Sequence, residues 1–205
     1  MANGKVTTGF SYPFVALYSA SGTTVTYTSG QALARGVDVT LSPESSSDNI
    51  FYADNRQAEN AGNKITGYSL SLTVDGLHQA AEKLILGLPN ADGSGWTAIG
   101  GDSQEVPYCG VGWLTRYMED GVTSFVAYLC SKVKFNAIEK AASTQEDEID
   151  WQTQSLEAAG FKSDSSEGEF YKMSEEFKVG ATYTTEAAAE AAALAALKTA
   201  LGVTP

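Results

Sequence analysis

The feature that most constrains the fold is a pair of long apolar and aromatic runs joined by an Asp-Gly turn. The runs span residues 106–118 and 122–136, and Glu119-Asp120-Gly121 connects them. Asp-Gly between two such runs is a strong short-range signal for a β-hairpin, because both residues tolerate the positive φ angles of a tight turn. We therefore expect a long antiparallel hairpin over these two runs.

Other segments also show the pattern of strands. The clearest is 65–74, where Tyr68, Leu70, Leu72 and Val74 alternate with small polar residues, as in a half-buried strand. The remaining predicted strands are 12–20, 23–28, 33–41, 151–157 and 170–179, with Ser21-Gly22 as the turn of a second hairpin. The sequence thus predicts a mainly β (α+β) body over residues 1–180.

One helix is predicted within this body, over about residues 76–87. Asp75 precedes it as a candidate N-cap, and Gly87 is a natural residue to end it. Apolar residues recur at helical spacing between these ends, which predicts a short flanking helix that packs against the body through one apolar stripe.

The segment 181–205 predicts a second, Ala-rich helix from Glu186 to about Leu201, with Thr185 as its N-cap. Its expected apolar stripe is Leu194, Leu197 and Leu201. This helix either docks on the body or acts as a peripheral arm, because an alanine face buries little area.

Two long polar segments interrupt the strands. Residues 42–64 are predicted as a long inter-strand loop with an apolar island at Ile50-Phe51-Tyr52-Ala53. Aromatic residues in such a loop must bury against their own domain or against a neighbouring molecule. Residues 137–150 are predicted as an acidic loop.

Charge and composition exclude several classes of protein. The 205 residues include 13 Lys and Arg against 25 Asp and Glu, a formal net charge of −12. This disfavours a protein that grips nucleic acid or anionic lipid, since both depend on basic side chains. No signal peptide or membrane span is visible, so we expect a chain kept in a cytoplasm. Cys109 and Cys130 are then reduced and buried, and a cross-strand disulfide is the less favoured alternative.

No catalytic or metal motif is apparent. His78 is the single histidine and has no sequence partner for a triad or metal site. Gly110-Val111-Gly112 lies inside an apolar run, which favours a bulge or close packing over a dinucleotide site. The acidic residues at 146–150 lack the spacing of a calcium loop. We expect no enzyme activity, cofactor or metal, and the remaining picture is that of an assembly subunit.

Several motifs, taken in order, resemble those of one protein family. The most specific are Gly4-Lys5-Val6-Thr7-Thr8-Gly9-Phe10 and Asn49-Ile50-Phe51-Tyr52-Ala53-Asp54-Asn55. Others lie at 12–13, 32–37, 72–77, 106–112, 116–118 and 144–154. Together they resemble the major tail proteins of long, non-contractile-tailed bacteriophages of Gram-positive hosts.

The resemblance implies a β-sandwich or partial barrel with a flanking helix. It also implies a virion protein, made in the host cytoplasm, that polymerises as stacked hexameric rings into a tail tube. Implied partners are further copies of itself, the tape measure protein, and the tail-terminator and tail-tip proteins, while DNA passes through the lumen without specific binding. Candidate contacts between subunits are Ile50, Phe51, Tyr52, Asp54, Asn55, Phe10 and Tyr12.

Two alternatives remain open at this point. One is a carbohydrate-binding β-sandwich that uses Trp96, Trp113 and Trp151 as stacking platforms. The other is the tube subunit of a phage-derived injection device, which belongs to the same assembly class.

Overall fold

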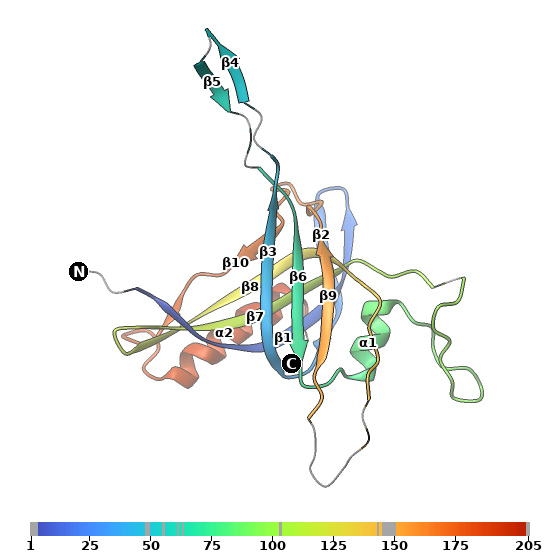
Figure 1. Ribbon diagram of the computed structural model, residues 1–205. Coiled ribbons are helices and arrows are strands. Elements are labelled where there is room, and N and C mark those ends of the chain that lie inside the picture. The colour runs from blue at the N-terminus through green and yellow to red at the C-terminus, as the bar shows by residue number, and fades with distance from the viewer. Residues whose placement is uncertain are drawn as a thin grey trace.

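Strands dominate the computed structural model, which describes residues 4–47, 50–54, 56–60, 62, 64–102, 104–142, 144 and 151–203 (Figure 1). The elements are β1 (Val6–Ser21), β2 (Thr24–Ala32), β3 (Gly36–Ser45), β4 (Ile50–Ala53), β5 (Arg56–Asn60), β6 (Ile65–Val74), α1 (Gln79–Leu86), β7 (Cys109–Glu119), β8 (Val122–Phe135), β9 (Gln154–Gly160), β10 (Tyr171–Met173), β11 (Phe177–Lys178) and α2 (Glu186–Ala200). The predicted mainly β fold is confirmed.

Nine of these strands form one antiparallel sheet, and the predicted hairpin β7–β8 lies in its middle. The strand order is β2-β1-β7-β8-β9-β6-β3, and β10 and β11 also pair with β8. Asp120 and Gly121 both adopt positive φ, 50° and 78°, in the turn between β7 and β8. Gly22 does the same, at 60°, between β1 and β2. Both hairpin predictions are therefore confirmed.

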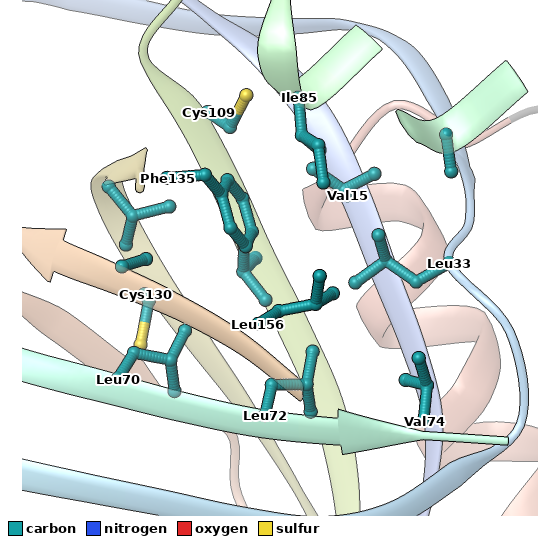
Figure 2. Packing of buried hydrophobic residues seen from close by; sticks show 14 of the residues in the cluster. Val15, Leu33, Leu70, Leu72, Val74, Ile85, Cys109, Cys130, Phe135 and Leu156 are labelled. Carbon is teal, nitrogen blue, oxygen red and sulfur yellow. The ribbon is translucent and has the colours of Figure 1, made fainter. Parts of the chain in front are cut away.

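The sheet curls so that its two halves face each other as a sandwich or partial barrel. Strands β3, β6 and β9 cross in front of β1, β7 and β8 (Figure 1). Alternation along β6 buries Tyr68, Leu70, Leu72 and Val74 between the halves and leaves Ser69 exposed. Ile85 from α1 closes the same core, where Figure 2 shows it beside Val15 and Leu33.

Helix α2 covers the outer face of β7 and β8, so the arm role considered for it is wrong. Ala189, Ala193, Leu197 and Leu201 are buried in a second core together with residues of β1, β7 and β8. Small residues permit this close approach: a Cβ built on Gly112 would lie 2.5 Å from Leu197 Cδ1. Leu197 and Leu201 of the predicted stripe are buried, whereas Leu194 is only partly buried, and Ala189 and Ala193 complete the buried face in its place.

Both helices begin at defined caps, one as predicted and one not. The Thr185 side chain accepts a hydrogen bond from Ala188 N (3.2 Å), which confirms it as the N-cap of α2. Asp75 does not cap α1, because His78 occupies that position. The Asp75 carboxylate instead accepts hydrogen bonds from Arg35 N (3.0 Å) and Arg35 Nε (2.5 Å). Gly87 ends α1 in the left-handed conformation, as expected.

Several predicted boundaries shift. The segment 42–64 is not one unstructured loop, since β3 extends to Ser45 and β4 and β5 pair as a two-stranded hairpin within it. Leu33 is buried but precedes β3, and the last predicted strand is two short ones, β10 and β11. Residue 143 and residues 145–150 of the acidic loop lie outside the described residues.

Cys109 and Cys130 are buried and free, so the disulfide alternative is wrong. They are not opposite each other, because Cys109 pairs with Val133 and Cys130 with Val111. Burial raises the pKa of each thiol to about 12. Within the described residues, no helix is long and apolar enough to cross a membrane.

Candidate assembly surfaces

The features that could have carried chemistry have structural roles. His78 is the exposed N-cap residue of α1. Gly110 lies at a register shift between β7 and β8, and Tyr27 occupies the space that a side chain at Gly110 would need. Within the described part of the chain, no group of three or more His, Cys, Asp or Glu side chains is placed to hold a metal ion.

The hairpin β4–β5 carries most of the predicted contact residues. Ile50 pairs with Asn60 and Phe51 with Glu59, while β4 and β5 pair with no other described strand. The hairpin stands away from the body beyond the ends of β3 and β6 (Figure 1). An isolated two-stranded hairpin is only marginally stable in water, so a second surface is needed to hold it.

The hairpin turn is exposed. Asp54 has a positive φ of 50° there, and Asn55, which follows it, lies outside the described residues. Ile50 is half-buried at the base of the hairpin. Three of the predicted contact residues, Ile50, Phe51 and Tyr52, therefore share one short strand, β4, and Asp54 follows it.

Phe10 and Tyr12 form a separate group. The Phe10 ring fills the space beside Gly36 at the start of β3, so it packs within its own chain. Tyr12 has a positive φ of 54°, lies at a register shift between β1 and β7, and is 41% exposed. The hairpin follows the other end of β3, about 30 Å away at 3.3 Å per residue. The structure therefore does not bring these residues together with the hairpin.

A hollow of about 410 Å³ opens beside Phe10, between β1 and β3. Trp113 and Tyr128 stack in its wall, with centroids 5.8 Å apart, and the hydroxyls of Tyr117 and Tyr128 are 2.8 Å apart. Burial raises the pKa of Tyr128 to about 12, so its hydroxyl stays neutral at physiological pH. Asp38 is the one charged residue among the described residues that line the hollow, and the rest of its wall is apolar or carries hydroxyl groups.

The outward face of β3, β6 and β9 is polar and acidic. Because side chains alternate along a strand, the residues that share this face follow from the register of the three strands. They are Asp38, Thr40, Ser42 and Glu44 on β3, Ser69, Ser71 and Thr73 on β6, and Ser155, Glu157 and Ala159 on β9. None of these three strands contains Lys or Arg. We call this surface the acidic sheet face.

Sequence reasoning identified β6 by its alternation but did not identify the acidic sheet face. The polar positions of β6 were visible, but the pairing of Ser71 with Thr40 and Glu157 depends on strand order. The Ser71 hydroxyl donates a hydrogen bond to Glu157 Oε1 (2.7 Å), although the two residues are far apart in sequence. The predicted strand 33–41 contains Arg35, so the absence of Lys and Arg from this face became visible only with the observed bounds of β3.

The three tryptophans do not form a common binding platform. Trp113 is 3% exposed in the core, so its ring has no free face for a sugar. Trp96 and Trp151 are 78% and 84% exposed. They belong to different connections, Trp96 to the one between α1 and β7 and Trp151 to the one between β8 and β9. This arrangement disfavours the carbohydrate-binding alternative in its three-tryptophan form.

Comparison with known proteins does not assign a family. No protein-family model matches the sequence. No curated protein matches it either.

Proposed function

We propose that this chain is a structural virion protein, the major tail protein of a bacteriophage with a long, non-contractile tail. In this proposal it polymerises as stacked hexameric rings into the tail tube, which forms the channel for the genome. The observation that carries the proposal is the hairpin β4–β5, which bears Ile50, Phe51 and Tyr52 and pairs with no other described strand. The sequence motifs that resemble major tail proteins support the same conclusion.

The position of the hairpin favours polymerisation over a closed dimer. It projects from one end of the sheet (Figure 1), and in the proposed tube it docks on a different surface of a neighbouring copy. Such a heterologous contact repeats from copy to copy and produces a ring or an open filament. A tube needs two contacts, one between neighbouring subunits of a ring and one between subunits of successive rings.

The edges of the sheet offer a second contact. Strands β2 and β3 are its terminal strands, and each pairs with one described neighbour only. Exposed edges pair readily with strands of another chain. Pro43 lies within β3 and lacks an N–H group, which is tolerated at an edge. In the proposed ring, these edges would join the sheets of neighbouring subunits.

The acidic sheet face suits the wall of a channel for DNA. It presents small hydroxyl side chains with Asp38, Glu44 and Glu157 and no basic residue from its three strands. Phosphate is repelled by carboxylates and is held mainly by Lys and Arg. We infer that this face lines the lumen, where it would let DNA slide. The remaining expected partners are the tape measure, tail-terminator and tail-tip proteins.

Negative-stain electron microscopy of the purified protein at increasing concentration tests the proposal. Rings or tubes that form without any added ligand are the expected result. A glycan array on the same preparation serves as the control for the carbohydrate-binding alternative. Particles that stay monomeric at all concentrations and bind a glycan would refute the proposed function.

A further inference from the structure

A basic and aromatic surface lies beside the end of β9. We define the lysine–tyrosine patch as Tyr18, Tyr108, Lys132, Lys134 and Phe161. Lys132 Nζ lies 5.2 Å and 4.7 Å from the ring centroids of Tyr18 and Tyr108, and Lys134 Nζ lies 5.6 Å from that of Tyr108. The rings of Tyr108 and Phe161 meet edge to face at 5.5 Å, and each residue is 39% exposed. The patch therefore offers ammonium groups and aromatic rings on one surface.

One carboxylate holds this patch in place. Asp164 Oδ2 accepts hydrogen bonds from Lys132 Nζ (2.7 Å) and from the Tyr18 hydroxyl (2.8 Å). The Asp164 backbone N–H also donates to the Tyr18 hydroxyl (2.9 Å). Burial lowers the pKa of Lys132, but the hydrogen bond to Asp164 and the attraction to its charge, together with smaller contributions from Tyr18 and Tyr108, leave the pKa raised. Lys132 therefore stays charged and fixed in position.

The patch retains positive charge that is not paired within the subunit. Asp164 accounts for the charge of Lys132, whereas Lys134 forms no ion pair with any described residue. Lys162 follows Phe161 and is exposed. A basic surface is unusual on this chain, because residues 141–205 contain 12 acidic and 4 basic residues. The chemistry of the patch fits an acidic peptide that carries an aromatic side chain.

The chain itself contains such a segment. Glu146, Asp147, Glu148 and Asp150 immediately precede Trp151 in the sequence. The four acidic residues lie outside the described residues, but Trp151 is described and is 84% exposed. Carboxylates can pair with lysine ammonium groups, and an indole can pack on tyrosine and phenylalanine rings. The segment 146–151 therefore complements the lysine–tyrosine patch in charge and in apolar character.

The two surfaces lie at opposite ends of one strand. Trp151 precedes the first residue of β9, Gln154, while Phe161 follows its last residue, Gly160. A strand of this length separates its ends by about 20 Å at 3.3 Å per residue, which keeps Trp151 away from the patch of its own subunit. We propose that the segment 146–151 of one copy binds the lysine–tyrosine patch of a second copy. This inference rests on the proposed function, because it assigns one head-to-tail contact of the tube.

Two charge-reversed variants test the contact, because they should assemble only when they are mixed. The first variant is Lys134→Glu with Lys162→Glu, and the second is Glu146→Lys with Glu148→Lys. Each variant alone brings like charges together and should not assemble, whereas an equal mixture should assemble in alternation. Lys83→Glu is the control for charge reversal away from the patch: it reverses one lysine on α1, half the charge change of the double variant, and should assemble like the unmodified protein. Assembly is measured by sedimentation and electron microscopy.

A peptide measures the same contact without assembly. A fluorescein-labelled peptide of residues 144–154 should bind the unmodified protein below its assembly concentration, more weakly as salt is raised. Lys134→Glu with Lys162→Glu should weaken this binding at least tenfold, Lys83→Glu should not change it, and Trp151→Ala in the peptide should weaken it.

The outcomes separate this inference from the proposed function. If the unmodified protein forms tubes and both charge-reversed variants also form them alone, the contact is wrong and the proposed function stands. Failure of the mixture to assemble, or of the peptide to bind, also overturns the contact. If the unmodified protein never assembles but the peptide binds the patch specifically, the proposed function fails and the contact is supported.

Discussion

Replacing Leu197 by alanine tests whether α2 is an integral part of the subunit. Leu197 is 1% exposed and its Cδ1 occupies the space over Gly112, between the helix and β7. The same change at Leu194 is the matched control, because that residue lies on the same helix and is only partly buried. Leucine and alanine differ little in helix propensity, so the comparison isolates packing.

The expected loss follows from burial. Truncation of a fully buried leucine costs about 2–5 kcal/mol, which combines lost transfer free energy with the cavity that remains. The glycine beneath Leu197 has no side chain that could fill this cavity, so we expect about 3 kcal/mol for Leu197→Ala. Leu194→Ala should cost about 1 kcal/mol, since a half-buried side chain removes less apolar area from water.

Urea unfolding of the dispersed protein, followed by circular dichroism, measures both losses. At a slope of about 2 kcal/mol per molar urea, the midpoint should fall by about 1.5 M for Leu197→Ala and about 0.5 M for Leu194→Ala. Equal small shifts for both variants, with most of the circular dichroism transition unaffected, would show that α2 is a loosely attached arm. That result would refute the packing argument.

Three further outcomes are expected. Deleting residues 50–55 removes β4 and the hairpin turn, so the variant should fold as a monomer but form no tubes in electron micrographs, whereas normal tubes would contradict the assembly role of the hairpin. Cys109 and Cys130 should resist a thiol reagent at pH 8 in the native protein and react in urea, because a pKa of about 12 leaves only on the order of one thiol in ten thousand ionised at that pH; fast labelling of the native protein would contradict their burial. Thr185→Ala should lower the free energy of unfolding by about 1 kcal/mol because it removes the N-cap, while Thr185→Ser should preserve most of it, as measured by urea unfolding.

The strand hairpins could be predicted because their signals are local. Gly22 and the Asp120-Gly121 pair lie between long runs of strand-forming residues, and the turn chemistry alone sets the connection. The alternation of β6 likewise reports a property of that strand by itself. The existence and type of these elements therefore followed from neighbouring residues.

The errors arose where distant residues decided the outcome. Asp75 has the side chain of an N-cap, but its partner is Arg35, which tertiary structure places beside it. The stripe of α2 was predicted on three leucines, but Ala189 and Ala193 are buried where Leu194 was expected, and Gly112 on β7 makes room for Leu197 and Leu201. Neither contact has a signal within one element.

The candidate surfaces show the same division. The apolar residues of β4 were recognised as contact candidates from their polar surroundings, although their pairing with β5 was not. The acidic sheet face and the lysine–tyrosine patch required the order of strands, since each draws residues from several elements. The residues of each surface are far apart in the sequence, and only the fold brings them together.

The place of β9 in the sheet sets an order of events during synthesis. It lies between β6 and β8, but it is translated after both. Until β9 emerges from the ribosome, one edge of β6 has no strand to pair with. The outer face of β7 and β8 stays uncovered until α2 has also been translated. Non-local strand pairing of this kind is slow, and incomplete chains expose apolar surface and unpaired strand edges that promote aggregation. A nascent chain therefore cannot present a finished subunit to its neighbours, and a chain that stops before β9 would aggregate rather than join a growing polymer.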